Sequence, residues 1–400
     1  MMTPANEHIS SLEKRLLVCC ARTKLTPEVA ATICEILAGP LDWDYLLCEA
    51  QENSITPLLD RHLSALAPDA APATVREQLK KSCRANTVRC LFLTAELINI
   101  LRLFQSQNIP AIPYKGPVVA AQAYGALALR EFEDLDIILR QSDLLKAHEI
   151  IVSLGYKPKF DWILSPGATA SVVPGEYNYR DEPRRAIVEL HTEITLRHFP
   201  VKPDLDAFIR NLAPVRLSDR DILTFTAEDL LPMLCIHGSK DFWERLSWIA
   251  DVSELVQSHP ALDWDRVARF AQPLNATRML NLGLALAVRV LDASLPSEVS
   301  ARVQADRVAC QVAAEVRQRL LSRPFRTLDA AGRFHFRRRM LAGKFDGWRY
   351  AMRLAVVPSE DDWQMMRLPP ALAPLYVALR PLRLLQKYGW AGRRDVKPLS

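Results

Sequence analysis

The sequence predicts an α+β protein in which a small mixed sheet with helices is embedded between helical lobes. Apolar residues recur at helical spacing over residues 10–107, and the longest helix is expected from Thr74 to Gln107. Short apolar runs alternate with helical segments over residues 109–196, which indicates an α/β layer. From residue 200 onward the pattern is helical again, with breaks at Pro214, Pro260, Pro273 and Pro296. We therefore expect an N-terminal helical lobe (1–108), an α/β core (109–199), a helical domain (200–316) and a basic helical C-terminal region (317–400).

Helix-start signals define the N-terminal lobe. The run Ser10 to Glu13 resembles a capping box that opens a first helix. Thr26-Pro27 provides an N-cap followed by proline at the first helical position, and Gly39-Pro40 ends that second helix. We expect this lobe to serve packing more than catalysis.

The core region contains strands and helices in alternation. We expect strands at 109–114 and 132–139, with a helix at 117–125 between them and a helix from Ser142 to about Leu154 after them. Further strands are expected within 156–162, 171–179 and 185–194.

Two carboxylates lie on one of these strands. Side chains alternate across a strand, so Asp134 and Asp136 project from the same face while Leu135 projects from the other. Neighbouring carboxylates repel each other without a cation, and together they make an oxygen-rich cradle for divalent ions. An Asp-x-Asp pair alone is a weak pattern, and many such pairs are solvated. The apolar strand around this pair and the upstream Lys115-Gly116 favour a catalytic role.

A third acidic strand follows at 185–194. Glu189 and His191 share one of its faces. Glu189 can complete a metal site or accept the proton of an attacking hydroxyl, and His191 can act as a base or a hydrogen-bond donor. The alternatives are a polar outer strand face for Glu189 and a structural histidine for His191.

The order Lys-Gly, helix, Arg-x-x-x-Asp-Leu-Asp-Ile and Val-Glu-Leu-His resembles the nucleotidyltransferases of the DNA polymerase beta superfamily. It is most similar to an uncharacterised bacterial nucleotidyltransferase family with a Lys-Gly first motif. The resemblance covers roughly residues 85–390, including the helical stretch 234–251 and tail segments near 358–363 and 375–383. It implies a polymerase-beta-like core, Gly116 as the motif glycine, and a metal site formed by Asp134, Asp136 and Glu189.

The resemblance implies transfer of an NMP from an NTP to a hydroxyl or phosphate of an unidentified acceptor, with pyrophosphate as the leaving group. We expect two Mg²⁺ ions, because magnesium suits an all-oxygen site. Lys115, Gly116 and Arg130 are the candidate nucleotide-binding residues. Arg130 can instead form an ordinary ion pair with a carboxylate.

Pro117 departs from the superfamily pattern, in which serine or glycine follows the motif glycine. Proline removes a backbone N–H donor and a hydroxyl, although Lys115 can supply a point charge for the triphosphate. This departure motivates a second hypothesis, a catalytically inactive nucleotide-binding or scaffolding module.

Two further segments carry candidate residues. His237 and Lys240 lie on one face of a predicted helix and can hold the nucleotide or acceptor if that helix covers the site, whereas Trp243 and Trp248 favour simple packing. Residues 317–400 contain 18 Lys and Arg against 6 acidic residues. The aromatic and arginine run 333–339 suits a nucleic-acid backbone, an anionic membrane surface, or the acidic body of the protein itself. A transferase directed at RNA through 317–400 is therefore a third hypothesis.

The sequence indicates a cytoplasmic protein. Residues 1–8 lack the features of a signal peptide, and the most apolar stretch, 280–291, is interrupted by Arg289. The eight cysteines show no C-x-x-C spacing and are expected to be mostly buried thiols in a reducing compartment.

Overall fold

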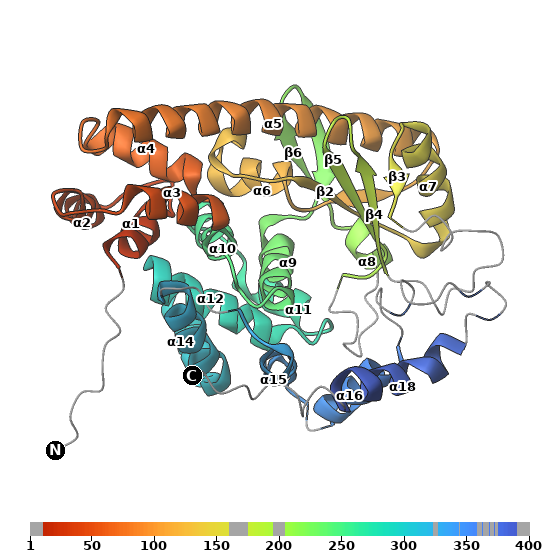
Figure 1. Ribbon diagram of the computed structural model, residues 1–400. Coiled ribbons are helices and arrows are strands. Elements are labelled where there is room, and N and C mark those ends of the chain that lie inside the picture. The colour runs from red at the N-terminus through yellow and green to blue at the C-terminus, as the bar shows by residue number, and fades with distance from the viewer. Residues whose placement is uncertain are drawn as a thin grey trace, which may run out of the picture.

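One long helix, α5 (Ala73–Ser106), joins an N-terminal helical lobe to a small sheet (Figure 1). This computed structural model describes residues 11–159, 175–194, 205–322, 327–343, 345–357 and 375–389, with Asp362, Leu368 and Leu372. The lobe contains α1 (Leu12–Cys20), α2 (Pro27–Leu37), α3 (Trp43–Glu52) and α4 (Thr56–Leu66). Ser11 caps α1 and Thr26 caps α2 through their side chains. The predicted long helix and the Thr26-Pro27 start signal are confirmed. The first helix begins as expected, but Ser11 accepts from Lys14 N–H, Glu13 accepts from Asp42 N–H, and Ser10 lies outside the described residues, so the expected capping box is not shown.

The sheet lies beneath α5 at the right of Figure 1. Its described strands are β1 (Ala111–Pro113), β2 (Asp134–Leu139), β3 (Lys157–Pro158), β4 (Glu176–Asp181) and β5 (Ala186–His191), in the order β1-β2-β5-β4-β3. β2 and β5 are parallel, and the other neighbours are antiparallel. The protein is therefore α+β with a small mixed sheet, as predicted. Parts of two predicted strands, 160–162 of the strand 156–162 and 171–174 of the strand 171–179, lie outside the described residues.

Short helical segments connect the first strands. α6 (Pro117–Val119) continues into a π-helical turn at Ala120–Tyr124, followed by a 3-10 turn at Leu127–Leu129. After β2, a 3-10 turn at Gln141–Asp143 leads into α7 (Leu144–Ser153). Leu135, Ile137 and Leu139 are buried on the side of β2 that alternates with Asp136, and α5 packs against this strand. The opposite side of β2 is left for polar side chains.

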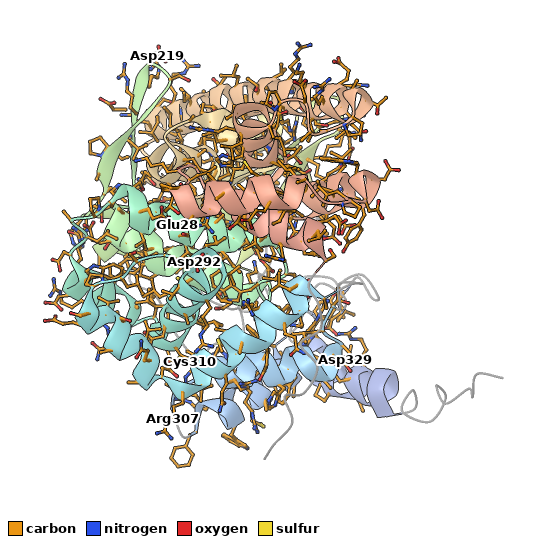
Figure 2. The ribbon with its side chains drawn as sticks, turned by 90° about the vertical axis from the view of Figure 1, so that its left-hand side faces the viewer. Glu28, Asp219, Asp292, Arg307, Cys310 and Asp329 are labelled. Atoms are coloured by element: carbon orange, nitrogen blue, oxygen red, sulfur yellow. The ribbon has the colours of Figure 1, made fainter. Side chains whose placement is uncertain are left out.

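The prediction of helices alone after residue 200 is wrong for 213–224. α8 (Leu205–Ile209) is followed by a hairpin of β6 (Ala213–Leu217) and β7 (Arg220–Thr224), with Asp219 at its tip (Figure 2). Val215, Leu217 and Ile222 alternate with more exposed residues, which is a strand pattern. Pro214 therefore lies in an exposed hairpin strand, where proline is tolerated.

The remaining described helices form a bundle and a C-terminal group. The bundle contains α9 (Ala227–Lys240), α10 (Leu246–Ser258), α11 (Trp264–Ala271), α12 (Thr277–Leu291), α13 (Ser297–Ala305) and α14 (Arg307–Leu321), and α12 packs against α9, α10 and α14. The C-terminal group contains α15 (Ala330–Met340), α16 (Asp346–Val356) and α18 (Leu375–Gly389). Among the described residues, every helix is too short or too polar to cross a membrane.

All eight cysteines are free thiols. Cys20, Cys90 and Cys235 are buried, while Cys34 and Cys48 are exposed. The expectation of mostly buried thiols therefore holds for only part of the set.

Candidate active site

Two neighbouring strands bring predicted carboxylates to one face of the sheet. The parallel register of β2 and β5 pairs Asp136 with Glu189 and Ile138 with His191. Because side chains alternate along each strand, Asp134, Asp136, Glu189 and His191 project from the same face. This face is the one opposite the apolar side of β2.

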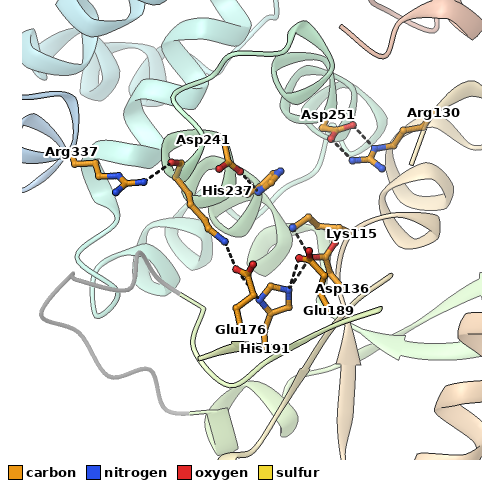
Figure 3. Close-up of polar contacts among 11 residues, drawn as sticks. Lys115, Arg130, Asp136, Glu176, Glu189, His191, His237, Asp241, Asp251 and Arg337 are labelled. Atoms are coloured by element: carbon orange, nitrogen blue, oxygen red, sulfur yellow. Dashed lines mark hydrogen bonds and ion pairs between the residues drawn. The ribbon is translucent and has the colours of Figure 1, made fainter. Parts of the chain in front are cut away.

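Asp136, Glu189 and His191 form a group whose potential ligand atoms all lie within 4.8 Å of one another. His191 Nε2 lies 2.9 Å from Asp136 Oδ1 and 3.6 Å from Glu189 Oε2 (Figure 3). The other oxygen of Asp136, Oδ2, is buried and has no hydrogen-bond partner in the described part of the chain. A buried anionic oxygen without a partner is costly, and a divalent cation would satisfy it. The two carboxylates supply the oxygen ligands that Mg²⁺ prefers, and His191 lies within hydrogen-bond distance of Asp136.

Asp134 lies outside this group of three. Burial raises the pKa of Asp134 to about 7, and the charge of Asp136 adds to the effect. The two aspartates therefore interact electrostatically, as expected from their spacing. The residues within ligand distance of Asp136, however, come from the neighbouring strand.

Lys115 follows β1 and reaches Asp136. Its Nζ atom lies 2.6 Å from Asp136 Oδ1, and the two side chains are only 11% and 0% exposed. Burial alone would raise the pKa of Asp136, but Lys115 and His191 hold that pKa well below its usual range. Asp136 is therefore an anion at neutral pH in spite of its burial.

Gly116 permits the turn that places Lys115. Its φ of +51° and ψ of −120° lie in a region that side chains rarely enter. A Cβ atom here would stand 3.2 Å from the carbonyl oxygen of Asp134. Pro117 is the first residue of α6, a position where a missing N–H breaks no intrahelical bond. The Gly-Pro pair is therefore compatible with the local backbone.

A family of uncharacterised nucleotidyltransferases matches residues 39–292, which is more than half of the chain. The chain belongs to this family. The protein is therefore a nucleotidyltransferase, as the sequence predicted. The matched range starts and ends earlier than the expected 85–390, and it includes the whole sheet, the three clustered residues and helices α9 to α11. No curated protein matches the chain.

Helix α9 lies over the polar face of the sheet in this nucleotidyltransferase (Figure 3). Lys240 forms an ion pair with Glu176, which sits opposite His191 in the register of β4 and β5. Burial would raise the pKa of Glu176, but Lys240 and then His191 lower it to about 2. Alternating charges thus run from Lys115 through Asp136 and His191 to Glu176 and Lys240.

His237 lies on the same helix, and its side chain is largely buried. Its Nδ1 atom is 3.3 Å from Asp241 Oδ2, and its ring packs edge-on against Trp248 at 5.3 Å between centroids. Burial lowers the pKa of His237 well below its usual value, and the charge of Lys115 acts in the same direction. His237 is therefore a neutral imidazole beside the charged cluster. Trp243 is fully buried, so the packing role expected for this tryptophan is also present.

Glu176 is a site residue that the sequence reasoning missed. It lies on β4, within the predicted strand segment 171–179, but its importance depends on pairing between β4 and β5. The one signal available was a carboxylate on the predicted strand that precedes the acidic strand in the chain. The sequence alone does not reveal that Lys240, 64 residues away, reaches it.

Of the two partners expected for Arg130, the structure shows the carboxylate. Arg130 Nε and Nη2 each donate to Asp251 at 2.8 Å, and Tyr124 Oη donates to the same carboxylate at 2.8 Å. The arginine and aspartate side chains are 10% and 2% exposed. The Nε and Nη2 atoms of Arg130 are thus engaged with Asp251, which fits the ion-pair alternative, and the nucleotide contact expected for Arg130 stays a prediction.

The basic run 333–339 lies on α15 and largely contacts the protein body. Arg333 and Arg337 stack over the ring of Phe242, and Arg337 donates to the carbonyl oxygen of Lys240 at 3.4 Å. Arg339 pairs with Glu315 at 2.7 Å. This arrangement matches the expected pairing of the basic helix with the body for three of its arginines. The tail segment near 358–363, which the resemblance included, lies outside the described residues except for Asp362.

Proposed function

We propose that this nucleotidyltransferase moves an NMP from an NTP to a hydroxyl or phosphate of its acceptor in a magnesium-dependent reaction. The observation that supports this proposal most strongly is the buried Oδ2 of Asp136 beside Glu189, which has no hydrogen-bond partner among the residues that the structure describes. In the reaction, an acceptor oxygen forms a bond to the α-phosphorus. The bond from that phosphorus to the bridging oxygen breaks, and pyrophosphate leaves.

Asp134, Asp136 and Glu189 would hold the metal, with His191 fixing the orientation of Asp136. Two Mg²⁺ ions would stabilise the negative charge that develops on the transferring phosphoryl group and its attacking and leaving oxygens. Glu189 is the carboxylate that can take the proton of the acceptor hydroxyl. It is partly exposed, which leaves it accessible to an acceptor.

Two lysines at the site supply positive charge for the triphosphate. Lys115 is nearly buried against Asp136, whereas the Lys240 side chain is 40% exposed and lies on the helix that covers the sheet. Lys240 can therefore turn from Glu176 to a phosphate oxygen without leaving solvent. His237, as a neutral imidazole, can donate a hydrogen bond to the nucleotide or to the acceptor.

The direct test supplies each labelled NTP with cell extract and measures NMP-modified products and pyrophosphate. We expect Asp136→Asn to lower the rate at least about a hundredfold, which corresponds to about 2.7 kcal/mol of barrier. Asp219→Asn is the matched control, because the same chemical change is made at the exposed hairpin tip (Figure 2). Equal rates for wild type and Asp136→Asn would remove the cluster from the chemistry.

Calorimetry separates the alternatives that the sequence raised. A non-hydrolysable NTP should bind wild type only with Mg²⁺ or Mn²⁺, and Asp136→Asn should lose this metal dependence. Metal-dependent binding without turnover would favour the inactive nucleotide-binding module that Pro117 suggests. RNA binding with steep salt dependence, lost on removal of 317–400, would favour an RNA acceptor.

A further inference from the structure

The C-terminal group of helices exposes large apolar side chains beside arginines. On α16 and the residue before it, Phe345, Trp348 and Met352 are 76%, 67% and 46% exposed. Their spacing of three and four residues puts them in one row along the helix. Single exposed apolar residues need no explanation, but a row of this size does.

Cationic side chains border this row. Arg349 and Arg353 are exposed, and each follows a member of the apolar row by one position, so they form a second row along its side. Arg338 of α15 is also exposed, and its side chain passes Gly347 at the start of α16. Among the described residues, no carboxylate pairs with these three arginines. We call Phe345, Trp348, Met352, Arg349 and Arg353 the α16 surface.

The buried side of the same helix explains why the row faces outward. Tyr350 is 1% exposed and stacks with Phe334 of α15 at 5.8 Å between centroids. α16 also packs against α18, at the bottom of Figure 1. The helix is thus anchored on one side, and the described part of the chain does not cover its apolar and cationic rows on the other.

Local charge favours an anionic occupant. Residues 327–357 contain seven Lys and Arg against two Asp. An amphipathic helix with aromatic and aliphatic side chains on one strip and arginines on the next suits the headgroup region of an anionic bilayer. Phe345 and Trp348 offer rings, but Met352 and, on neighbouring α18, Leu375 and Leu382 are exposed aliphatic side chains. Aliphatic side chains enter the headgroup boundary of a bilayer and cannot stack on a base, which favours lipid over single-stranded RNA.

We propose that the α16 surface docks this protein on an anionic lipid surface. The apolar row enters the headgroup boundary, and the arginines contact lipid phosphates. This role is peripheral and is independent of the proposed catalytic cluster, which lies on another part of the chain.

Vesicle cosedimentation of the full chain tests the proposal. We expect binding to phosphatidylcholine vesicles that contain phosphatidylglycerol, little binding to pure phosphatidylcholine, and weaker binding as salt increases. Phe345→Ser combined with Trp348→Ser, and Arg349→Glu combined with Arg353→Glu, should each weaken binding at least about tenfold.

Control double variants at other exposed positions show whether a loss of binding is specific to the α16 surface or follows from any similar change in apolarity or charge. Val88→Ser with Leu91→Ser removes exposed apolar side chains from α5, and Arg289→Glu with Arg302→Glu makes the same charge change on α12 and α13. Both control pairs should bind vesicles like wild type. NMP transfer in solution should be unchanged in all four double variants, so failure of docking is distinguishable from failure of the proposed reaction.

Several outcomes would overturn the proposal. These are no binding to anionic vesicles, equal loss in the control pairs, or equal binding to neutral and anionic vesicles. Binding to a single-stranded RNA but not to vesicles would also overturn it and would assign the surface to nucleic acid.

Discussion

The buried ion pair of Arg130 and Asp251 allows a direct test of whether Arg130 stabilises the fold or binds the triphosphate. If Arg130 stabilises the fold through Asp251, replacing it by methionine leaves a carboxylate that is 2% exposed. Its remaining side-chain partner among the described residues is then the Tyr124 hydroxyl. Removing one member of such a buried pair costs about 3–5 kcal/mol of unfolding free energy. A loss of that size is a large part of the stability of a typical domain.

The double replacement sharpens the prediction. Arg130→Met with Asp251→Leu removes both charges, so no uncompensated ion is buried, and the double variant should be more stable than Arg130→Met alone. A triple variant that also carries Tyr124→Phe avoids leaving the Tyr124 hydroxyl without its acceptor, and it should likewise be more stable than Arg130→Met alone. Urea denaturation followed by tryptophan fluorescence measures all variants.

An exposed pair serves as the control. Arg216 and Asp221 lie 3.3 Å apart in the β6–β7 hairpin, with side chains more than 60% exposed, so Arg216→Met should change stability by less than about 0.5 kcal/mol. A stability loss below about 1 kcal/mol for Arg130→Met, together with a collapse of NTP binding, would refute the reasoning. Arg130 would then act on the triphosphate, as the sequence also allowed.

Three further predictions concern backbone, packing and pH. Gly116→Ala should cost at least about 1–2 kcal/mol of stability and lower transfer activity, because its φ is +51°; unchanged melting and rates would contradict this. Gly238→Ala should lower the melting temperature although alanine favours helices, since a Cβ there would meet the Trp243 ring at 2.6 Å, whereas Gly347→Ala, with 3.4 Å to its nearest neighbour, should not. Burial raises the pKa of Glu131 to about 7, so its folded form holds a proton that the unfolded form releases near pH 4.5. Stability should therefore fall as pH rises from about 4.5 through 7, and Glu131→Gln should flatten that decline in denaturation measured across this range.

Alternation along single strands made much of the sheet face predictable. The spacing of Asp134 and Asp136, and of Glu189 and His191, depends only on the local twofold repeat of a strand, which the structure shows. Long α5 was predictable for a similar reason, because its apolar stripe is a local pattern.

Partners far apart in the sequence were not predictable. The alignment of Asp136 with Glu189 depends on strand register, and the reach of Lys240 to Glu176 depends on where α9 packs. Asp251 is 121 residues from Arg130 in the sequence. The sequence could therefore suggest that Arg130 forms an ion pair, but it could not identify Asp251 as the partner. The β6–β7 hairpin was missed because its strands are short and Pro214 resembles a helix break.

The contact between Arg337 and the carbonyl oxygen of Lys240 ties the last turn of α9 to the C-terminal helices. The side chain of that same lysine reaches the sheet, while its main chain is held by a residue outside the range that defines the family. Trimming the protein to the family range would therefore loosen the end of the helix that covers the polar face of the sheet. A low transfer rate in such a shortened protein could follow from the loss of the Arg337 contact alone. It would therefore say nothing about the role of the carboxylates.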